Sequence, residues 1–259
     1  MQQTDHSLLK KMNIQSDAIV VNQCDRYAFE EIEYQGHTVR YFHCRERGVG
    51  LSRNTALLRA TADIVLFADD DVTYVDGYAD IVASAFRQNN AADMIIFNVI
   101  GNNPDRPIPL IGQPSRVRWY NCLRYGTVRI AVRTESVRQA NVHFSLLFGG
   151  GARHSAGEDN LFVFDCLRKG LRVYTDPAVI GYVDQRRSSW FEGYTDKYLM
   201  DTGVLYYHLF GRWARPFALV QLIRHRTRFG QDRSLLEALA LITKGIHQCQ
   251  RRRPGQRCF

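Results

Sequence analysis

Residues 64–73 read Ile-Val-Leu-Phe-Ala-Asp-Asp-Asp-Val-Thr, an apolar run that ends in three consecutive aspartates. A short apolar run of this kind is typical of a buried strand. In open α/β sheets the carboxyl ends of the strands are where ligands bind. Three adjacent carboxylates repel one another, and a divalent cation is the usual compensation. A solvated acidic turn that caps a helix is the alternative, and the apolar strand directly before the aspartates disfavours it.

Further apolar runs on both sides of this strand predict strands at 18–21, 38–42, 94–97, 127–132 and 172–174. Helical patterns lie between them, at 54–60, 77–88, 135–139 and 161–169. Strands that alternate with helices predict an α/β fold with a mainly parallel sheet flanked by helices.

The chain from about residue 191 onward has a helical pattern. Ser234-Leu-Leu-Glu237 is a capping box, and we expect the helix that it opens to stop at Gly245. The sequence therefore predicts two parts, an α/β domain over 1–190 and a helical, basic C-terminal extension over 191–259.

The composition is that of a folded protein. Of the 259 residues 45% are hydrophobic and 12% aromatic, which is enough to bury a core and excludes disorder as the main state. No run reaches 18 apolar residues, and the first residues lack the basic-then-apolar pattern of a secretory signal. The six cysteines are scattered without a CxxC pair, which disfavours zinc and indicates reduced thiols. These features predict a cytoplasmic protein.

The net charge of +8 is concentrated at the C-terminus. Residues 212–259 carry eleven Lys and Arg against Asp232 and Glu237, a balance of +9, so residues 1–211 come to −1. Apolar residues at 217–220 and 222–223 lie between these arginines, a mixture that suits a helix on an anionic membrane surface. A packed extension with solvated arginines is the alternative, whereas few aromatics are present to stack on nucleic acid. We expect a peripheral location on the cytoplasmic face of a membrane.

Two chemistries fit the three aspartates, and the first is phosphate transfer. The pattern from Asp69 to Thr73 resembles the D-x-D-x-T motif of haloacid-dehalogenase-like phosphatases, in which Asp69 would be the nucleophile and Asp71 the acid/base. That superfamily also needs a lysine near the phospho-aspartate, and none occurs between Lys11 and Lys169. The aspartates also follow the third predicted strand, whereas in that superfamily they usually follow the first. This alternative is disfavoured.

The second chemistry is sugar transfer. Gly48-Val-Gly-Leu-Ser-Arg-Asn-Thr-Ala56 resembles the G-x-x-x-A-R-N-x-A helix start of family 2 inverting glycosyltransferases, which have the GT-A fold. Phe67-Ala-Asp-Asp-Asp71 resembles the D-x-D strand end of that family. Phe148 to Gly151, followed by Gly157-Glu-Asp-x-x-Phe162, resembles its acceptor loop and E-D motif. The segments occur in the family's order within residues 7–190.

The resemblance implies an enzyme that moves a sugar from a nucleotide diphosphate sugar to a hydroxyl of a glycan or a lipid-linked acceptor, with inversion, in surface polysaccharide synthesis. It implies Asp159 as the catalytic base, with Glu158 orienting that base or the acceptor. It also implies a divalent metal, Mn²⁺ or Mg²⁺, held by Asp71 with help from Asp69. In the family the first of these aspartates more often faces the nucleotide ribose.

Other residues take more peripheral roles in this resemblance. The implied donor contacts are Arg53, Asn54, Asp69, Asp70 and Asn22; the implied third metal ligand is Asp184; and the implied acceptor contacts are Gly150, Gly151 and Trp190. An arginine fork suits phosphate, and the amide of Asn22 can bond a nucleobase edge.

The sequence departs from the family at its start. The strand that usually comes first is not present ahead of residue 18, and Asn22-Gln23 replaces the usual acidic pair. We expect an upstream strand to pair with the edge beside Ile19–Val21. A non-catalytic, basic binding protein on a glycosyltransferase scaffold is therefore a second alternative, which turnover of a nucleotide sugar would distinguish.

Overall fold

The computed structural model describes residues 3–104, 107–185, 193–224 and 234–250. Its N-terminal sheet has the strand order β1-β3-β2, after a short helix α1 (Ser7–Lys11). β1 (Ala18–Gln23) pairs with β3 (His37–Cys44) in parallel, and β2 (Ala28–Tyr34) pairs with β3 as an antiparallel hairpin. The hairpin turns at Gln35 and Gly36, both at positive φ, as tight hairpins require.

The second sheet has the order β4-β8-β6-β9-β5, with β7 beside β9. Its strands are β4 (Ile64–Leu66), β5 (Val72–Tyr74), β6 (Met94–Gly101), β7 (Ser115–Arg116), β8 (Ile130–Arg133) and β9 (Val173–Val183). Only β6 and β9 pair in parallel among its described strands. The α/β class is confirmed, but the sheet is mixed rather than mainly parallel. β8 is reached without a crossover helix, and antiparallel pairing needs none.

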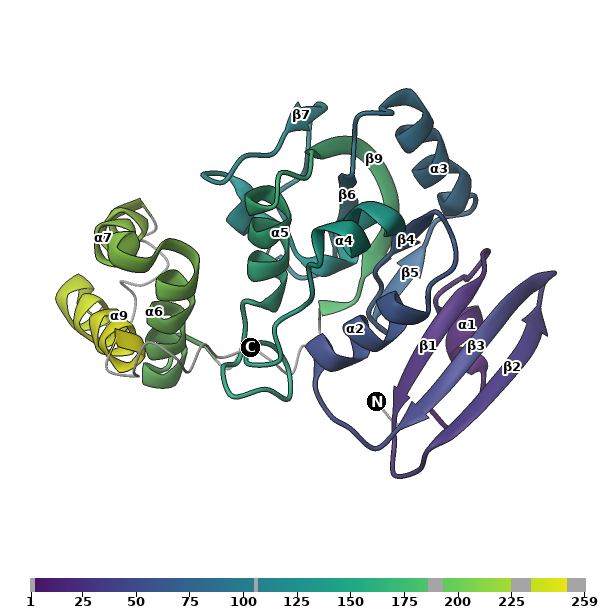
Figure 1. Ribbon diagram of the computed structural model, residues 1–259, viewed down its shortest axis with the longest axis horizontal. Helices are drawn as coiled ribbons and strands as arrows, with labels where there is room; N and C mark the ends of the chain where they lie inside the picture. Colours follow the sequence, from purple (N-terminus) through teal and green to yellow (C-terminus); the bar gives the residue numbers. More distant parts are fainter. Residues whose placement is uncertain (1–2, 105–106, 186–192, 225–233, 251–259) are drawn as a thin grey trace.

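Helices cover both sheets. They are α2 (Val49–Arg59), α3 (Tyr78–Gln88), α4 (Thr134–Ala140) and α5 (Glu158–Arg168). One core lies between the N-terminal sheet, α1, α3 and the second sheet, so Tyr41 of β3 shares it with Phe97 of β6. The sheets therefore belong to one packed body, with the N-terminal sheet at one end of the view in Figure 1.

An aromatic trio fixes α5 against the end of β4. The rings of Phe144 and Phe162 stack with centroids 4.0 Å apart, and Phe67 packs edge-on against Phe144 at 5.0 Å. Phe67 precedes the three aspartates by two residues, and Phe162 lies one turn after the start of α5. Stacked and edge-on pairs are the favoured arrangements of aromatic rings. The trio therefore brings two acidic segments of the chain to the same place.

Helix and strand bounds differ from the sequence prediction at a few points. α2 starts at Val49, with Gly48 as N-cap at φ 128°, rather than after Ser52. The strand predicted over 127–132 starts instead as a 3-10 turn, Thr127–Arg129, and continues as β8.

Three C-terminal helices, α6 (Asp196–Phe210), α7 (Ala214–Arg224) and α9 (Leu235–Gln250), group together at the other end of the molecule (Figure 1). The capping box is confirmed: the Ser234 amide donates to Glu237 at 3.1 Å and the Glu237 amide to Ser234 Oγ at 3.2 Å. The predicted stop at Gly245 is wrong. A Cβ at Gly245 or Gly203 would collide with the backbone oxygen of the facing helix, so these glycines let α6 and α9 approach closely.

Helix α6 also packs on the α/β part. Val204, Leu205 and Leu209 share a buried cluster with Phe148 and Leu161. The predicted boundary at 190 lies outside the described residues. Within the described ranges, none of the helices has the length and hydrophobicity needed to cross a bilayer.

Candidate active site

The three aspartates form the turn between β4 and β5. The amide of Val72 donates to the Asp69 carbonyl at 3.2 Å, and the Lys11 ammonium donates to the Asp70 carbonyl at 2.8 Å. The Oδ1 atom of Asp71 is buried without a hydrogen-bond partner. Burial, with the charges of Asp69 and Asp70, raises the pKa of Asp71 to about 6. An incompletely compensated carboxylate thus lies at this strand end.

Arg53 joins the aspartate turn to the start of α5. Its Nη2 donates to both carboxylate oxygens of Asp69, at 2.9 and 3.1 Å, and its Nη1 donates to Glu158 Oε1 at 2.8 Å. Arg53 is 8% exposed. Burial lowers the pKa of Arg53, but the charges of Asp69 and Glu158 outweigh it and leave the pKa raised. The guanidinium is therefore directed at two carboxylates rather than at solvent.

Asp159 lies at the N-terminus of α5 in a desolvated position. Its Oδ1 accepts the Asn160 amide at 2.7 Å, and a Cβ at Gly126 would be only 3.8 Å from its Oδ2. Burial, followed by the charge of Glu158, raises the pKa of Asp159 to about 7. The helix N-terminus favours the ionised form, and burial overcomes it. A carboxyl that titrates near neutral pH is suited to general-base catalysis.

The glycine loop before α5 is packed against the start of α2. The Val49 amide donates to the Gly150 carbonyl at 3.0 Å, and a Cβ at Gly151 would be 3.2 Å from Gly48. Gly149 is at φ 101°, where a side chain would also meet Val49 and Glu158. Gly150 and Gly151 thus contact the start of the Arg53 helix, and Gly149 beside them meets Glu158.

His154 and Asp201, which are not among the predicted site residues, tie this loop to α6. His154 Nδ1 lies 2.6 Å from Asp201 Oδ1, and both residues are buried. Asp201 Oδ2 accepts from the Ser155 amide and hydroxyl and from the Lys197 ammonium. Burial raises the pKa of Asp201, but these hydrogen bonds outweigh it and leave the pKa lowered. The signal in the sequence was that Asp201 is the one charged residue within the stretch 198–207.

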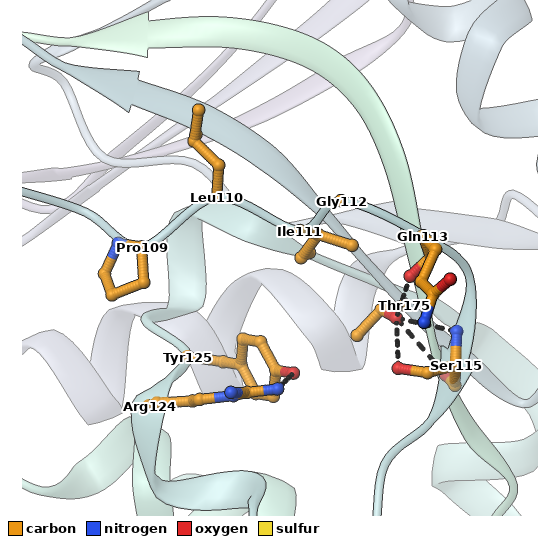
Figure 2. Close-up of a pocket in the computed structure, with 9 residues that line it drawn as sticks. All are labelled: Pro109, Leu110, Ile111, Gly112, Gln113, Ser115, Arg124, Tyr125 and Thr175. Atoms are coloured by element: carbon orange, nitrogen blue, oxygen red, sulfur yellow. Dashed lines mark hydrogen bonds between the residues drawn. The ribbon is translucent and has the colours of Figure 1, made fainter.

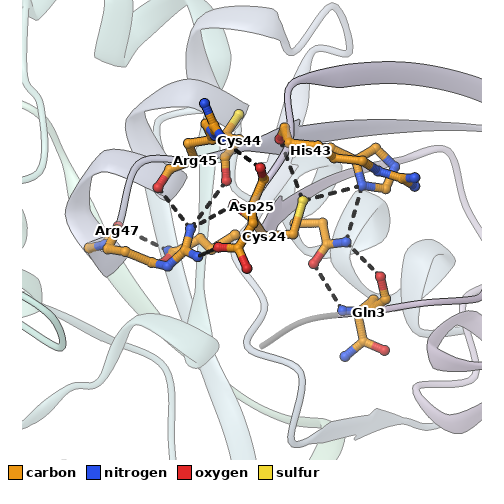
Figure 3. Close-up of polar contacts among 11 residues, drawn as sticks. Gln3, Cys24, Asp25, His43, Cys44, Arg45 and Arg47 are labelled. Carbon is orange, nitrogen blue, oxygen red and sulfur yellow. Dashed lines mark hydrogen bonds and ion pairs between the residues drawn. The ribbon is translucent and has the colours of Figure 1, made fainter.

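Two predicted donor contacts are engaged with the protein itself. The amide of Asn54 pairs with the Phe144 backbone, donating at 2.9 Å and accepting at 2.8 Å. Asn22 is 2% exposed and pairs in the same way with the Gln3 backbone, while its Nδ2 lies 3.2 Å from a ring nitrogen of His43. Figure 3 labels Gln3 and His43, two partners of this amide, and His43 lies one residue before the end of β3.

Asp184 is brought near Asp71 through the backbone. Its amide donates to the Asp71 carbonyl at 2.9 Å, while its Oδ1 accepts from Asn102 Nδ2 at 2.9 Å. In the part of the chain that the structure describes, no three His, Cys, Asp or Glu side chains are grouped to hold a metal ion. Trp190 lies outside the described residues.

A pocket of about 510 Å³ is lined in part by Tyr125, the residue directly before Gly126. It is lined by residues 109–113 together with Ser115, Arg124, Tyr125 and Thr175, and Figure 2 shows Arg124 and Tyr125 facing it from one side. Its loop wall is held by Asn98, which bonds the backbone of Ile111, and by buried Arg129, which donates to the Pro109 carbonyl. None of the predicted site residues lines this pocket.

Comparison with protein families decides the identity of the domain. Residues 1–144, more than half of the chain, match the model of glycosyl transferase family 2. The chain belongs to glycosyltransferase family 2. The matched range of this family 2 chain contains Arg53 and the three aspartates, and ends before Glu158 and Asp159. The membership sets the phosphatase alternative aside, although Lys11 does reach the aspartate turn.

Solved structures of S. aureus TarS show the same GT-A fold. The complex with UDP has a TM-score of 0.61 at 16% identity, with 93% of this chain and 75% of that chain covered. The complex with UDP-GlcNAc has a TM-score of 0.58 at 16% identity, with 77% and 60% covered. The family 2 chain thus spans 60% of the chain in that complex, and 46% of a longer TarS chain. No curated protein matches it.

We predict that Arg53→Met in this family 2 chain lowers the free energy of unfolding by about 3 kcal/mol, because Glu158 is left buried without its partner. This loss is at the low end of the range for breaking a buried ion pair, because the Asp69 side chain is 39% exposed. The measurement is urea unfolding followed by circular dichroism. Arg59→Met, on the exposed end of the same helix, is the control. Equal stability of the two variants would contradict a joining role for Arg53.

Proposed function

We propose that this chain transfers a sugar from a nucleotide diphosphate sugar to a hydroxyl of a glycan or lipid-linked acceptor, with inversion, in surface polysaccharide synthesis. The observation that carries the proposal is the carboxyl of Asp159. It has a pKa of about 7 and follows Glu158, which Arg53 joins to the strand-end aspartates. A general base whose pKa is near neutral, beside carboxylates of the kind that hold a metal ion, fits a single displacement at the anomeric carbon of a sugar.

Asp159 takes the proton in the proposed step. The acceptor oxygen attacks the anomeric carbon while its proton passes to the Asp159 carboxylate, and the bond from that carbon to the diphosphate breaks. The leaving diphosphate keeps the electron pair. Glu158 and Arg53 hold the start of α5 in position, and Gly150 and Gly151 supply the backbone along which the acceptor lies.

The residues present fit a divalent cation, Mn²⁺ or Mg²⁺. The unpartnered Oδ1 of Asp71 and the raised pKa of that carboxyl are what a cation would compensate. Mg²⁺ is usually held by one or two carboxylates together with substrate phosphates, so Asp71 and Asp69 suffice. A bound cation would neutralise charge on the leaving diphosphate. Asp184 stays a proposed third ligand, because its backbone bonds Asp71.

The donor we propose to test first is a uridine diphosphate sugar, because TarS structures of the same fold carry UDP-GlcNAc and UDP. Asp69 and Asp70 are the proposed donor contacts. The other three predicted donor contacts act on donor binding indirectly, by holding neighbouring residues in place. The polar groups of Arg53, Asn54 and Asn22 are bonded to Asp69, Phe144 and Gln3, respectively.

The two parts of the chain have separate proposed roles. Residues 1–190 form the transferase domain, and residues 191–259 form a basic extension that places it on the cytoplasmic face of an anionic membrane. The balance of +9 over 212–259 supports that partner. Of that range the structure describes 212–224 and 234–250.

The test is turnover of a panel of nucleotide sugars by the full chain, read as release of the nucleotide diphosphate, with Mn²⁺ or with EDTA. We expect release that depends on the metal and falls at acid pH. Metal-dependent binding of a nucleotide sugar with no release on any acceptor would favour the non-catalytic alternative. Release that is unchanged by EDTA would remove the metal from the proposal.

A further inference from the structure

Helix α7 has an apolar face that no other described part of the chain covers. Its small and apolar residues Ala214, Ala218 and Leu222 are spaced by one turn and are buried against α6 and α9. The solvent side carries large apolar side chains instead: Leu219 is 47% exposed, Val220 58% and Ile223 59%, and Trp213, in the 3-10 turn directly before the helix, is 62% exposed. A cluster of large apolar side chains in solvent is the mark of an interaction surface.

The charge around this face has one sign. Arg212, Arg215 and Arg224 are exposed on the same helix and on the turn before it, and the Arg212 guanidinium lies 5.6 Å from the Trp213 ring. No acidic residue occurs between Asp201 and Asp232 in the sequence. The surface therefore combines apolar side chains with cations and carries no anion of its own.

We propose that this α7 face docks the protein on an anionic lipid bilayer, with the helix lying in the plane of the interface. Trp213, Leu219, Val220 and Ile223 enter the boundary between headgroups and acyl chains, and the arginines meet the lipid phosphates. A basic helix with an apolar face suits such an interface, and tryptophan is enriched at that depth. A bilayer can bind this basic and apolar face without presenting acidic groups in a fixed arrangement that matches it.

The docked helix is connected to the candidate active site by α6. Helix α6 packs against α7, and its Asp201 holds His154 and Ser155 of the glycine loop. Docking would therefore hold the loop before Asp159 in a fixed relation to the membrane. This consequence rests on the proposed function, because it explains how a lipid-linked acceptor reaches the base. The docking surface itself deepens the membrane role proposed above for residues 191–259 and does not depend on the transferase role.

The experiment is sedimentation of the full chain with phosphatidylglycerol-containing vesicles and with pure phosphatidylcholine vesicles. The test variant is Leu219→Glu with Ile223→Glu, and Leu236→Glu is the control, because Leu236 is 79% exposed on α9 and lines a groove formed by α6 and α9 residues without any from α7. We expect the double variant to lose at least about tenfold in affinity for anionic vesicles, and the control to match the native chain. Both variants alter exposed positions, and thermal unfolding checks that each is folded.

Three results would overturn the proposal: no binding of the native chain to anionic vesicles, equal binding to both lipids, or equal binding of native chain and double variant. A concentration-dependent dimer in light scattering that the double variant abolishes would assign the face to a second copy instead. Vesicle binding needs no nucleotide sugar, so a failure here leaves the transferase proposal standing. A chain without turnover that still binds anionic vesicles would leave the docking surface standing.

Discussion

Replacing Asp159 by Asn is expected to reduce the rate of sugar transfer by about 10²–10⁴-fold, the usual contribution of a general base. Binding of the donor should stay within about threefold of native, because the lost interaction belongs to the transition state. The amide keeps the shape of the carboxyl and can still accept from the Asn160 backbone. The measurements are single-turnover transfer and calorimetric binding of the donor. Transfer within about tenfold of native would show that Asp159 is not the base.

The same substitution has an expected effect on stability that depends on pH. Burial raises the pKa of Asp159 from its ordinary 3.8 to about 7, so the folded protein holds this proton more tightly than the unfolded chain does. The carboxyl therefore destabilises the fold progressively as pH rises from about 4 to about 7, and fully above that. Asp159→Asn should raise the melting temperature at pH 8 and change it less at pH 4. In the native enzyme, kcat/KM should fall as pH drops through about 7.

Glu158→Gln is the matched control for this stability effect. The substitution also removes one carboxylate charge at the start of α5, but it weakens the ion pair with Arg53. We therefore expect Glu158→Gln to lower the melting temperature at pH 8, in the opposite direction to Asp159→Asn. If both variants shift the melting temperature the same way, the electrostatic account of this site is wrong.

Replacing Asp71 by Asn is expected to weaken metal-dependent binding of the donor by about one to three orders of magnitude, at about 1.4 kcal/mol per tenfold. The carboxylate has a buried, unpartnered oxygen, and an amide offers a cation no charge. In EDTA the variant should bind nucleotide as the native chain does. Calorimetry with UDP, with and without Mn²⁺, measures both.

The control for Asp71→Asn is Asp80→Asn, which makes the same charge change on the exposed first turn of α3. It should leave Mn²⁺-dependent binding unchanged. Thermal shift on adding Mn²⁺ gives a second reading, which the native chain and Asp80→Asn should show and Asp71→Asn should lack. Native Mn²⁺-dependent binding in the Asp71 variant would remove this carboxylate from the proposed metal set.

Much of the fold follows from local pattern. The apolar run before Asp69, the capping box at Ser234 and the acidic start of α5 are each encoded in a few neighbouring residues. The strand over 28–34 was missed because its Glu residues keep most of it exposed, so it has little hydrophobic signal. The antiparallel pairing of β8 was missed because strand partners are chosen by packing between distant segments.

The sequence alone determined which chemical groups stand at the ends of which elements: carboxylates after β4, an acid pair opening α5 and an arginine on α2. Tertiary structure decided which partners and which surroundings those groups have. Arg53 is directed inward because folding places Asp69 and Glu158 on either side of it, and His154 meets Asp201 across two elements. The pKa of Asp159 reaches about 7 chiefly because the folded chain removes water around it, with the charge of Glu158 as the second cause. Residue type and periodicity are local properties, whereas desolvation and ion pairing depend on which distant segments pack together.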